Sequence, residues 1–194
     1  MAIGWIIGGV VVLVVIIALI FIGYYNKFIV KGNRIDNSLA QIDVQLKKRA
    51  DLVPNLIETV KGYAKHEKSI ITEVTKARKE MMTAGTMNDK VKAGDKLQNA
   101  LKSIFAIGEN YPQLRANENF LHLQQELSAI EDKVAYSRQF YNDSVLDLNN
   151  SMKMFPGNIF AKMYGVQKRD FLEATEEERK VVKVKFWLKL YNGF

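Results

Sequence analysis

The first 26 residues carry no charged side chain, and this stretch restricts the fold of the chain more than any other feature. It reads MAIGWIIGGVVVLVVIIALIFIGYYN. About 20 apolar residues in an α-helix cross the hydrocarbon core of a bilayer, so this run is long enough to span one. A cleaved signal peptide is the alternative, but the run is too long and lacks a basic start and a small-residue cleavage site. Trp5, Tyr24 and Tyr25 bracket the run, as interfacial aromatic residues do. We therefore predict an uncleaved transmembrane anchor over residues 1–26.

Two features of the anchor bear on its packing and orientation. Gly4 and Gly8 have the spacing that lets transmembrane helices approach closely. Glycine is also common in such helices without a packing role, so this pair is a candidate helix-packing site in the membrane. Lys27, Lys31 and Arg34 follow the anchor. Because flanking cations favour the cytoplasmic side, we expect the N-terminus outside and the following domain in the cytoplasm.

A heptad pattern follows the anchor. Apolar residues recur in alternating steps of four and three residues, which predicts one long helix with a continuous packing face. Only Arg49 and Glu67 interrupt it. These two lie too far apart along one helix to pair with each other, so we expect each to meet a partner from another helix or chain and to fix the register. The pattern comprises Ile35, Leu39, Ile42, Leu46, Arg49, Val53, Leu56, Val60, Tyr63, Glu67, Ile70, Val74, Ala77 and Met81.

Pro54 lies inside this pattern, where a proline costs roughly 3 kcal/mol in a helix interior. The heptad phase is the same on both sides of it, so we interpret the site as a kink or a tight restart capped by Asp51. The helix is then expected to continue to Met81, and Pro54→Ala to be tolerated or mildly stabilising.

Further helices are predicted after the glycine of TAGTMND (83–89), which ends the first rod and supplies Asn88 as a cap. In the longest of them Ser137, Ser144 and Ser151 fall on the heptad positions and would allow a close neighbour. A rotation of the packing face towards Val145 and Met152 is the alternative. The expected helices run from about Val91 to Pro112, from 117 to 154, near 158–164 and around 170–181.

The C-terminal tail alternates apolar and other residues in VKVKFWLKLY. A period of two favours a β-strand, which would need a copy of itself or another partner to pair with. The bundle is expected to return the chain towards the membrane by residue 181, so membrane contact by the lysines and aromatic rings is a competing interpretation. A frayed terminus is the third. The candidate oligomer or membrane-contact residues are Lys183, Lys185, Phe186, Trp187, Leu188 and Lys189.

The residues that carry chemistry are sparse. Two histidines and no cysteine rule out a His/Cys metal site, and Glu118, His122 and Glu126 form only a weak constellation on one helical face. No phosphate-binding glycine loop or nucleophile elbow is present. The net charge of +7 comes without a nucleic-acid reader motif. We therefore expect no catalytic residue, no cofactor, no bound metal and no nucleic-acid partner.

Three segments together resemble the LemA family of bacterial membrane proteins. They read NRIDNSLAQIDVQLKKRADLVPNLIETVKGYAKHEK, NENFLHLQQELSAIEDKVAYSRQFYND and FPGN. The resemblance covers about residues 27–165 and implies an N-terminal transmembrane helix, an antiparallel helical domain and a link with membrane stress and membrane peptidases. It supplies no catalytic residues. The final WLKLYNGF departs from the family pattern, in which chains tend to stop soon after a stretch like VKVKF.

These observations predict an all-α chain, with a transmembrane helix at 1–26, a long up-and-down helical bundle at 27–180, and a basic, aromatic tail at 181–194 that is a candidate short β-strand. The expected protein is a single-pass scaffold of the bacterial inner membrane that self-assembles and organises or remodels the envelope. A sensor or adaptor that regulates a membrane protease or a stress response is the alternative. The expected partners are the lipid bilayer, further copies of the chain, and a membrane protease or other envelope protein.

Overall fold

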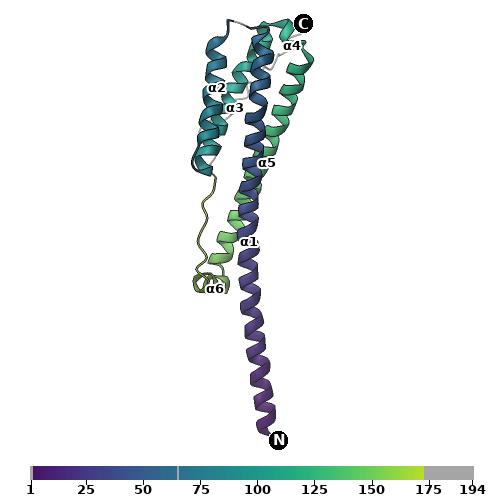
Figure 1. Cartoon of the computed structure of the whole chain (residues 1–194). Helices are drawn as coiled ribbons and strands as arrows, with labels where there is room; N and C mark the ends of the chain where they lie inside the picture. Colours follow the sequence, from purple (N-terminus) through teal and green to yellow (C-terminus); the bar gives the residue numbers. More distant parts are fainter. Residues whose placement is uncertain (1, 65, 173–194) are drawn as a thin grey trace, which may run out of the picture.

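Helices occupy most of the chain in the computed structural model, which describes residues 2–64 and 66–172 (Figure 1). Within these ranges every regular element is an α-helix and none is a strand, in agreement with the predicted all-α class. The helices are α1 (Ala2–Lys61), α2 (Lys68–Thr83), α3 (Met87–Asn110), α4 (Pro112–Arg115), α5 (Glu118–Lys153) and α6 (Gly157–Met163).

The long helices form an up-and-down bundle, as predicted (Figure 1). The second half of α1 packs mainly on α5, and α2 packs mainly on α3. Helix α2 returns towards the N-terminal end of α1, α3 runs away from it again, and α5 descends beside α1. Helix α6 then lies across the lower end of α5 and contacts α1.

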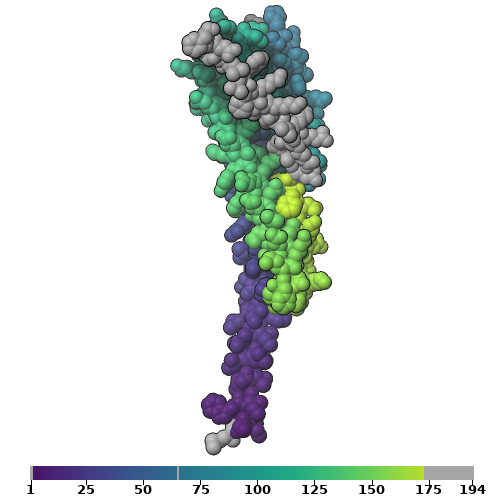
Figure 2. Space-filling model, turned by 180° about the vertical axis from the view of Figure 1, so that it is seen from behind, coloured from purple at the N-terminus to yellow at the C-terminus, as the bar shows by residue number. Residues whose placement is uncertain are grey.

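The apolar first part of α1 projects from the bundle as a lone helix (Figure 2). Its large side chains are exposed from Ile3 to Ile22, and the buried positions of α1 begin only at Phe28. Among the described residues, α1 is the one helix long and apolar enough to cross a membrane. The boundary between exposed and buried apolar side chains therefore falls where the uncharged stretch of sequence ends.

The predicted rod from Ile35 to Met81 is wrong in one respect, because α1 ends at Lys61 and α2 begins only at Lys68. The connection starts at Gly62 and includes the buried Ala64. An amphipathic helix can rotate about its own axis to turn its apolar face to the core. The unchanged heptad phase across residues 62–67 therefore did not require a single helix. Val74, Ala77 and Met81 are buried as predicted, but they belong to the separate helix α2.

The start of the later helices follows from side-chain caps. Thr86 caps α3 by accepting a hydrogen bond from the Asp89 backbone N–H, so the expectation that Asn88 is the cap was wrong. Asn117 accepts from the Phe120 backbone N–H and starts α5 one residue after the predicted boundary. Such caps satisfy backbone donors that have no partner inside the helix.

Both interpretations of the α5 packing face hold in part. Ser137 and Ser144 are buried, as the heptad positions predicted, but Val145 is buried as well. Ser151 is only partly buried. The packing face therefore rotates towards Val145 in the last third of α5.

Pro54 lies in the interior of α1, and the helix continues on both sides of it. Proline has no backbone N–H, so the carbonyl of Ala50 loses its usual helical donor. Arg78 of α2 replaces that donor: its Nε donates to the Ala50 carbonyl at 2.8 Å. Because Ala50 is fully buried, this bond satisfies a carbonyl that solvent does not reach. The proline thus creates an attachment point between α1 and α2.

This arrangement predicts coupling between positions 54 and 78. A hydrogen bond from a charged donor contributes about 1.5–3 kcal/mol, so Arg78→Met should lower the free energy of unfolding by that amount. In the Pro54→Ala background the same substitution should cost much less, because the alanine brings a backbone N–H that can bond the Ala50 carbonyl. Denaturant titration of the four variants in detergent, followed by circular dichroism, measures the coupling.

The matched control is Lys79→Met, which changes the exposed neighbour of Arg78 on the same helix. It should cost little in either background. An Arg78→Met penalty of equal size in the native and the Pro54→Ala backgrounds would contradict the role given to the Ala50 carbonyl.

Candidate functional site

No cluster of three histidine, cysteine or acidic residues that could hold a metal ion occurs within the part of the chain that the structure describes. The predicted constellation of Glu118, His122 and Glu126 lies on an exposed face of α5. His122 Nε2 is 3.9 Å from Glu126 Oε1, and both side chains are solvent-exposed. This geometry is that of a charged helix surface.

Gly4 and Gly8 lie on the projecting part of α1. A Cβ atom built at either glycine would meet no other atom within 4 Å. The described chain therefore provides no neighbour that uses the small size of these residues. Within the described residues, no close helix contact is made at this pair.

Arg49 of α1 is the most unusual residue of the bundle core. Its side chain is 2% exposed, and its Nη1 donates to the backbone carbonyl of Gly94 on α3 at 3.2 Å. A Cβ on Gly94 would lie 2.7 Å from Leu46 Cδ2, so glycine allows α3 to come this close to α1. The partner expected for Arg49 on another helix or chain is thus α3 of the same chain.

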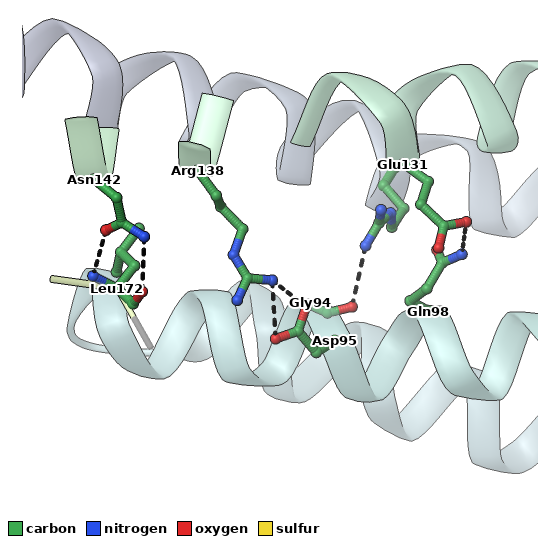
Figure 3. Close-up of polar contacts among 8 residues, drawn as sticks. Gly94, Asp95, Gln98, Glu131, Arg138, Asn142 and Leu172 are labelled. Atoms are coloured by element: carbon green, nitrogen blue, oxygen red, sulfur yellow. Dashed lines mark hydrogen bonds and ion pairs between the residues drawn. The ribbon is translucent and has the colours of Figure 1, made fainter. Parts of the chain in front are cut away.

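Figure 3 shows Gly94, Asp95 and Gln98 of α3 facing Glu131 and Arg138 of α5, and the charges of Asp95, Glu131 and Arg138 act on the Arg49 guanidinium. Arg138 Nη1 donates to Asp95 at 3.1 Å and 3.4 Å, and both side chains are largely buried. Gln98 donates to Glu131. We call Arg49, Asp95, Gln98, Glu131 and Arg138 the polar layer, since they join three helices at one level of the bundle.

The electrostatics of the polar layer have opposing parts. Burial lowers the pKa of the Arg49 guanidinium, the carboxylates of Glu131 and Asp95 raise it, and the charge of Arg138 lowers it. Arginine is nevertheless protonated at neutral pH because its ordinary pKa lies so far above that range. The polar layer therefore combines one fully buried cation, Arg49, with a second cation and two carboxylates that are only partly buried.

Glu67, the second predicted register residue, lies in the connection before α2 and not within a long helix. Tyr111 Oη donates to its Oε1 at 3.4 Å, and nearby the Asn117 amide donates to Tyr63 Oη at 3.0 Å. These contacts join the ends of helices at the top of the bundle. Glu67 therefore contacts another part of the chain, but it does so in a turn.

A segment that the sequence did not single out lies along α5 after α6. The side-chain amide of Asn142 pairs with both backbone groups of Leu172, and that of Asn149 pairs with both backbone groups of Arg169. Tyr141 Oη donates to the carbonyl of Asp170 at 2.8 Å. Burial raises the pKa of the Tyr141 phenol, so it stays a hydrogen-bond donor at neutral pH. These hydrogen bonds join side chains of α5 to the backbone of a distant segment, and no periodic pattern in the sequence predicts them.

The direction of this segment bears on the predicted tail. From Arg169 to Leu172 its partners shift from Asn149 back to Asn142, so the chain is moving away from the anchor where the described residues end. The chain has therefore already returned to the anchor end of α1 at α6, where Phe160 and Tyr164 contact Phe21, Tyr24 and Tyr25, and it runs away from the anchor again by residue 172. The candidate contact residues Lys183, Lys185, Phe186, Trp187, Leu188 and Lys189, like most of the helix predicted around 170–181, lie outside the described residues.

Comparisons with known proteins identify relatives of the chain. A family model described as LemA family matches residues 38–186. The magnetosome protein MamQ of Magnetospirillum gryphiswaldense is 23% identical over 173 residues, covering 76% of this chain and 64% of the relative. Protein LemA of Metamycoplasma hominis is 24% identical over 164 residues, covering 82% and 74%. The chain thus spans less than two thirds of the length of the magnetosome relative.

The polar layer makes a prediction about Arg49. Arg49→Ala removes a large, fully buried side chain and the donor to the Gly94 carbonyl, so it should lower the free energy of unfolding by about 2–5 kcal/mol. Arg49→Met should cost less, because methionine fills more of the volume while still removing the charge and the donor to Gly94. Denaturant titration of the full chain in detergent measures both values.

Lys48→Ala is the control, since Lys48 is the exposed neighbour of Arg49 on α1. Its effect should stay within about 0.5 kcal/mol of zero. If Arg49→Ala costs no more than Lys48→Ala, the polar layer does not stabilise the bundle.

Proposed function

The chain belongs to the LemA family, and from this premise we propose that it is a membrane-anchored helical scaffold that self-assembles and organises or remodels the cell envelope. The observation that carries the proposal is the continuity of α1. One helix of 60 residues holds both the apolar projecting part and the core of the bundle. At 1.5 Å per residue this helix is about 90 Å long, so it would cross the membrane with its first part and carry the bundle outward from the membrane surface with the rest.

The surface of the projecting part supports self-assembly. Its side chains are exposed on all faces, and no described part of the chain covers Gly4 or Gly8. In lipid, helices associate through close van der Waals packing, which small residues permit. In a homo-oligomer, the same helix of a second copy would pack against Gly4 and Gly8.

The relatives support the part of the proposal that concerns membranes. Two further proteins named magnetosome protein MamQ, both from Paramagnetospirillum magneticum, are 22% identical to the chain. The magnetosome role that these names state belongs to the relatives and is not assigned to this chain. For this chain we infer a single-pass protein of the bacterial inner membrane, with the N-terminus outside and the bundle in the cytoplasm, from Lys27, Lys31 and Arg34 after the anchor.

A sensor or adaptor that regulates a membrane protease or a stress response is the second candidate function. A cavity of about 630 Å³ favours it. The cavity lies between α1, α5, the turn between α2 and α3, and the segment of residues 166–170, with Phe28, Met87 and Tyr141 among its lining. A small ligand bound in this cavity would contact both the part of α1 that follows the anchor and the turn between α2 and α3. We propose no enzymatic activity for either function.

Self-assembly is tested by the mass of the extracted protein. The full chain in a mild detergent should run as a multimer in light scattering corrected for bound detergent. Gly4→Leu with Gly8→Leu should lower the multimer fraction, because leucine side chains keep two helix backbones apart at this pair. A wild-type protein that is strictly monomeric would contradict the proposal.

Gly9→Leu is the matched control, because Gly9 is an equally uncovered glycine that lies on another face of α1. It should leave the mass unchanged. If Gly9→Leu and the Gly4/Gly8 pair have the same effect, the small-residue spacing is not the contact.

A further inference from the structure

Four large apolar side chains are exposed around the turn between α5 and α6. Met154 is 66% exposed, Phe155 82%, Ile159 55% and Met163 50%. Ile159 and Met163 are four residues apart in α6 and therefore share one face of it. The opposite side of α6 is packed, since Phe160 and Ala161 are buried. We call Met154, Phe155, Ile159 and Met163 the apolar foot.

Helix α6 is fixed to α1 at the end of the uncharged stretch. The rings of Tyr24 and Phe160 stack with centroids 4.4 Å apart, and Phe21 meets Phe160 edge-on at 5.1 Å. Tyr164 Oη donates to the carbonyl of Phe21 at 2.8 Å. Edge-to-face and offset-stacked aromatic pairs of this kind hold a defined geometry. The position of the apolar foot along α1 is therefore set by this aromatic cluster.

These contacts place α6 at the edge of a bilayer that holds the anchor. The hydrocarbon core is about 30 Å thick, which corresponds to about 20 helical residues. A core that begins near Ile3 then ends near Ile22, and Phe21, Tyr24 and Tyr25 lie at its boundary. All three rings contact α6 or Tyr164 directly after it. The apolar foot thus lies within about one helical turn of the hydrocarbon edge.

The charges around the foot match an anionic lipid surface. From Leu148 to Gln167 the chain has Lys153 and Lys162 and no carboxylate. Both lysines are exposed. The first 35 residues likewise contain cations and no carboxylate. Short amphipathic helices with lysines beside apolar side chains lie in the plane of the membrane interface.

We propose that the apolar foot inserts into the interfacial region of the same lipid bilayer that α1 spans, as a second membrane contact. This inference rests on the proposed membrane anchoring of α1 and is independent of self-assembly. The bilayer is favoured over a second copy as the occupant, because the aromatic cluster brings the foot to the lipid level in every single chain. With two contacts, the angle between bundle and membrane is restricted.

Depth-dependent quenching tests the proposal. The chain has no cysteine, so Phe155→Cys and Ile159→Cys each give one site for an environment-sensitive fluorophore. The full chain is placed at one copy per nanodisc in lipids that carry a nitroxide in the headgroup or upper acyl region. Both labels should show blue-shifted emission and severalfold stronger quenching than a control label.

The control is Leu121→Cys, another exposed apolar residue of the same polypeptide, located in the first turn of α5 at the other end of the bundle. Circular dichroism checks that each labelled chain keeps its helix content. Quenching at residues 155 and 159 no stronger than at 121 would overturn the proposal. Blue-shifted emission that appears only at high protein density, without lipid quenching, would also overturn it and assign the foot to a second copy.

The outcome is separable from that of the self-assembly experiment. One copy per nanodisc removes any contribution from a multimer, so a monomeric protein in detergent leaves this measurement unaffected. A foot that stays in water leaves the Gly4 and Gly8 result unaffected in turn.

Discussion

The hydrogen-bond ladder of α1 continues from the uncharged stretch into the bundle core, and the position of every other element depends on it. Its weakest point is Pro54, which leaves the buried carbonyl of Ala50 without a helical donor. Arg78 supplies the donor from α2. A defect in one helix is thereby converted into a contact between two, and α1 does not have to end where the proline occurs. Because the helix continues, the anchor and the core of the bundle are joined within one helix, and α6 adds a second contact at Phe21, Tyr24 and Tyr25.

The contacts along α1 have different physical characters at different levels. At the level of Arg49 they are polar and buried, and the close approach at Gly94 gives the guanidinium its acceptor. A mostly apolar core tolerates sliding of helices more readily than buried hydrogen bonds do, so we infer that the polar layer fixes the register of α1, α3 and α5. Near the membrane the contacts are aromatic, between Tyr24, Phe160 and Tyr164. Between these two levels, side-chain amides of α5 hold the segment after α6 by its backbone.

Much of this fold was predictable because its causes are local and periodic. The lack of charge before Lys27 predicted the projecting helix, the heptads predicted α5, and Asn117 marked its start. The turn after Lys61 was missed because the apolar phase continues across it. The bonds of Arg78 to Ala50 and of Asn142 to Leu172 join residues distant in sequence, and no repeating pattern records such pairs. The predicted tail contacts of residues 183–189 and the membrane packing of Gly4 and Gly8 depend on surroundings outside the described residues, so they stay predictions.

The central claim is that the membrane anchor and the first helix of the bundle are one continuous helix, α1. The most direct measurement is the distance between spin labels at Ile29 and Glu58, two exposed positions of α1 on either side of Gly32 and Pro54. The full chain would carry both labels as cysteines in lipid nanodiscs, diluted with unlabelled protein so that only distances within one molecule are observed. A continuous helix predicts a single narrow distribution centred near about 44 Å, from 29 residues at 1.5 Å each. A broad distribution, or one centred at a clearly shorter distance, would mean that α1 bends or breaks between the membrane and the bundle, and would contradict the account.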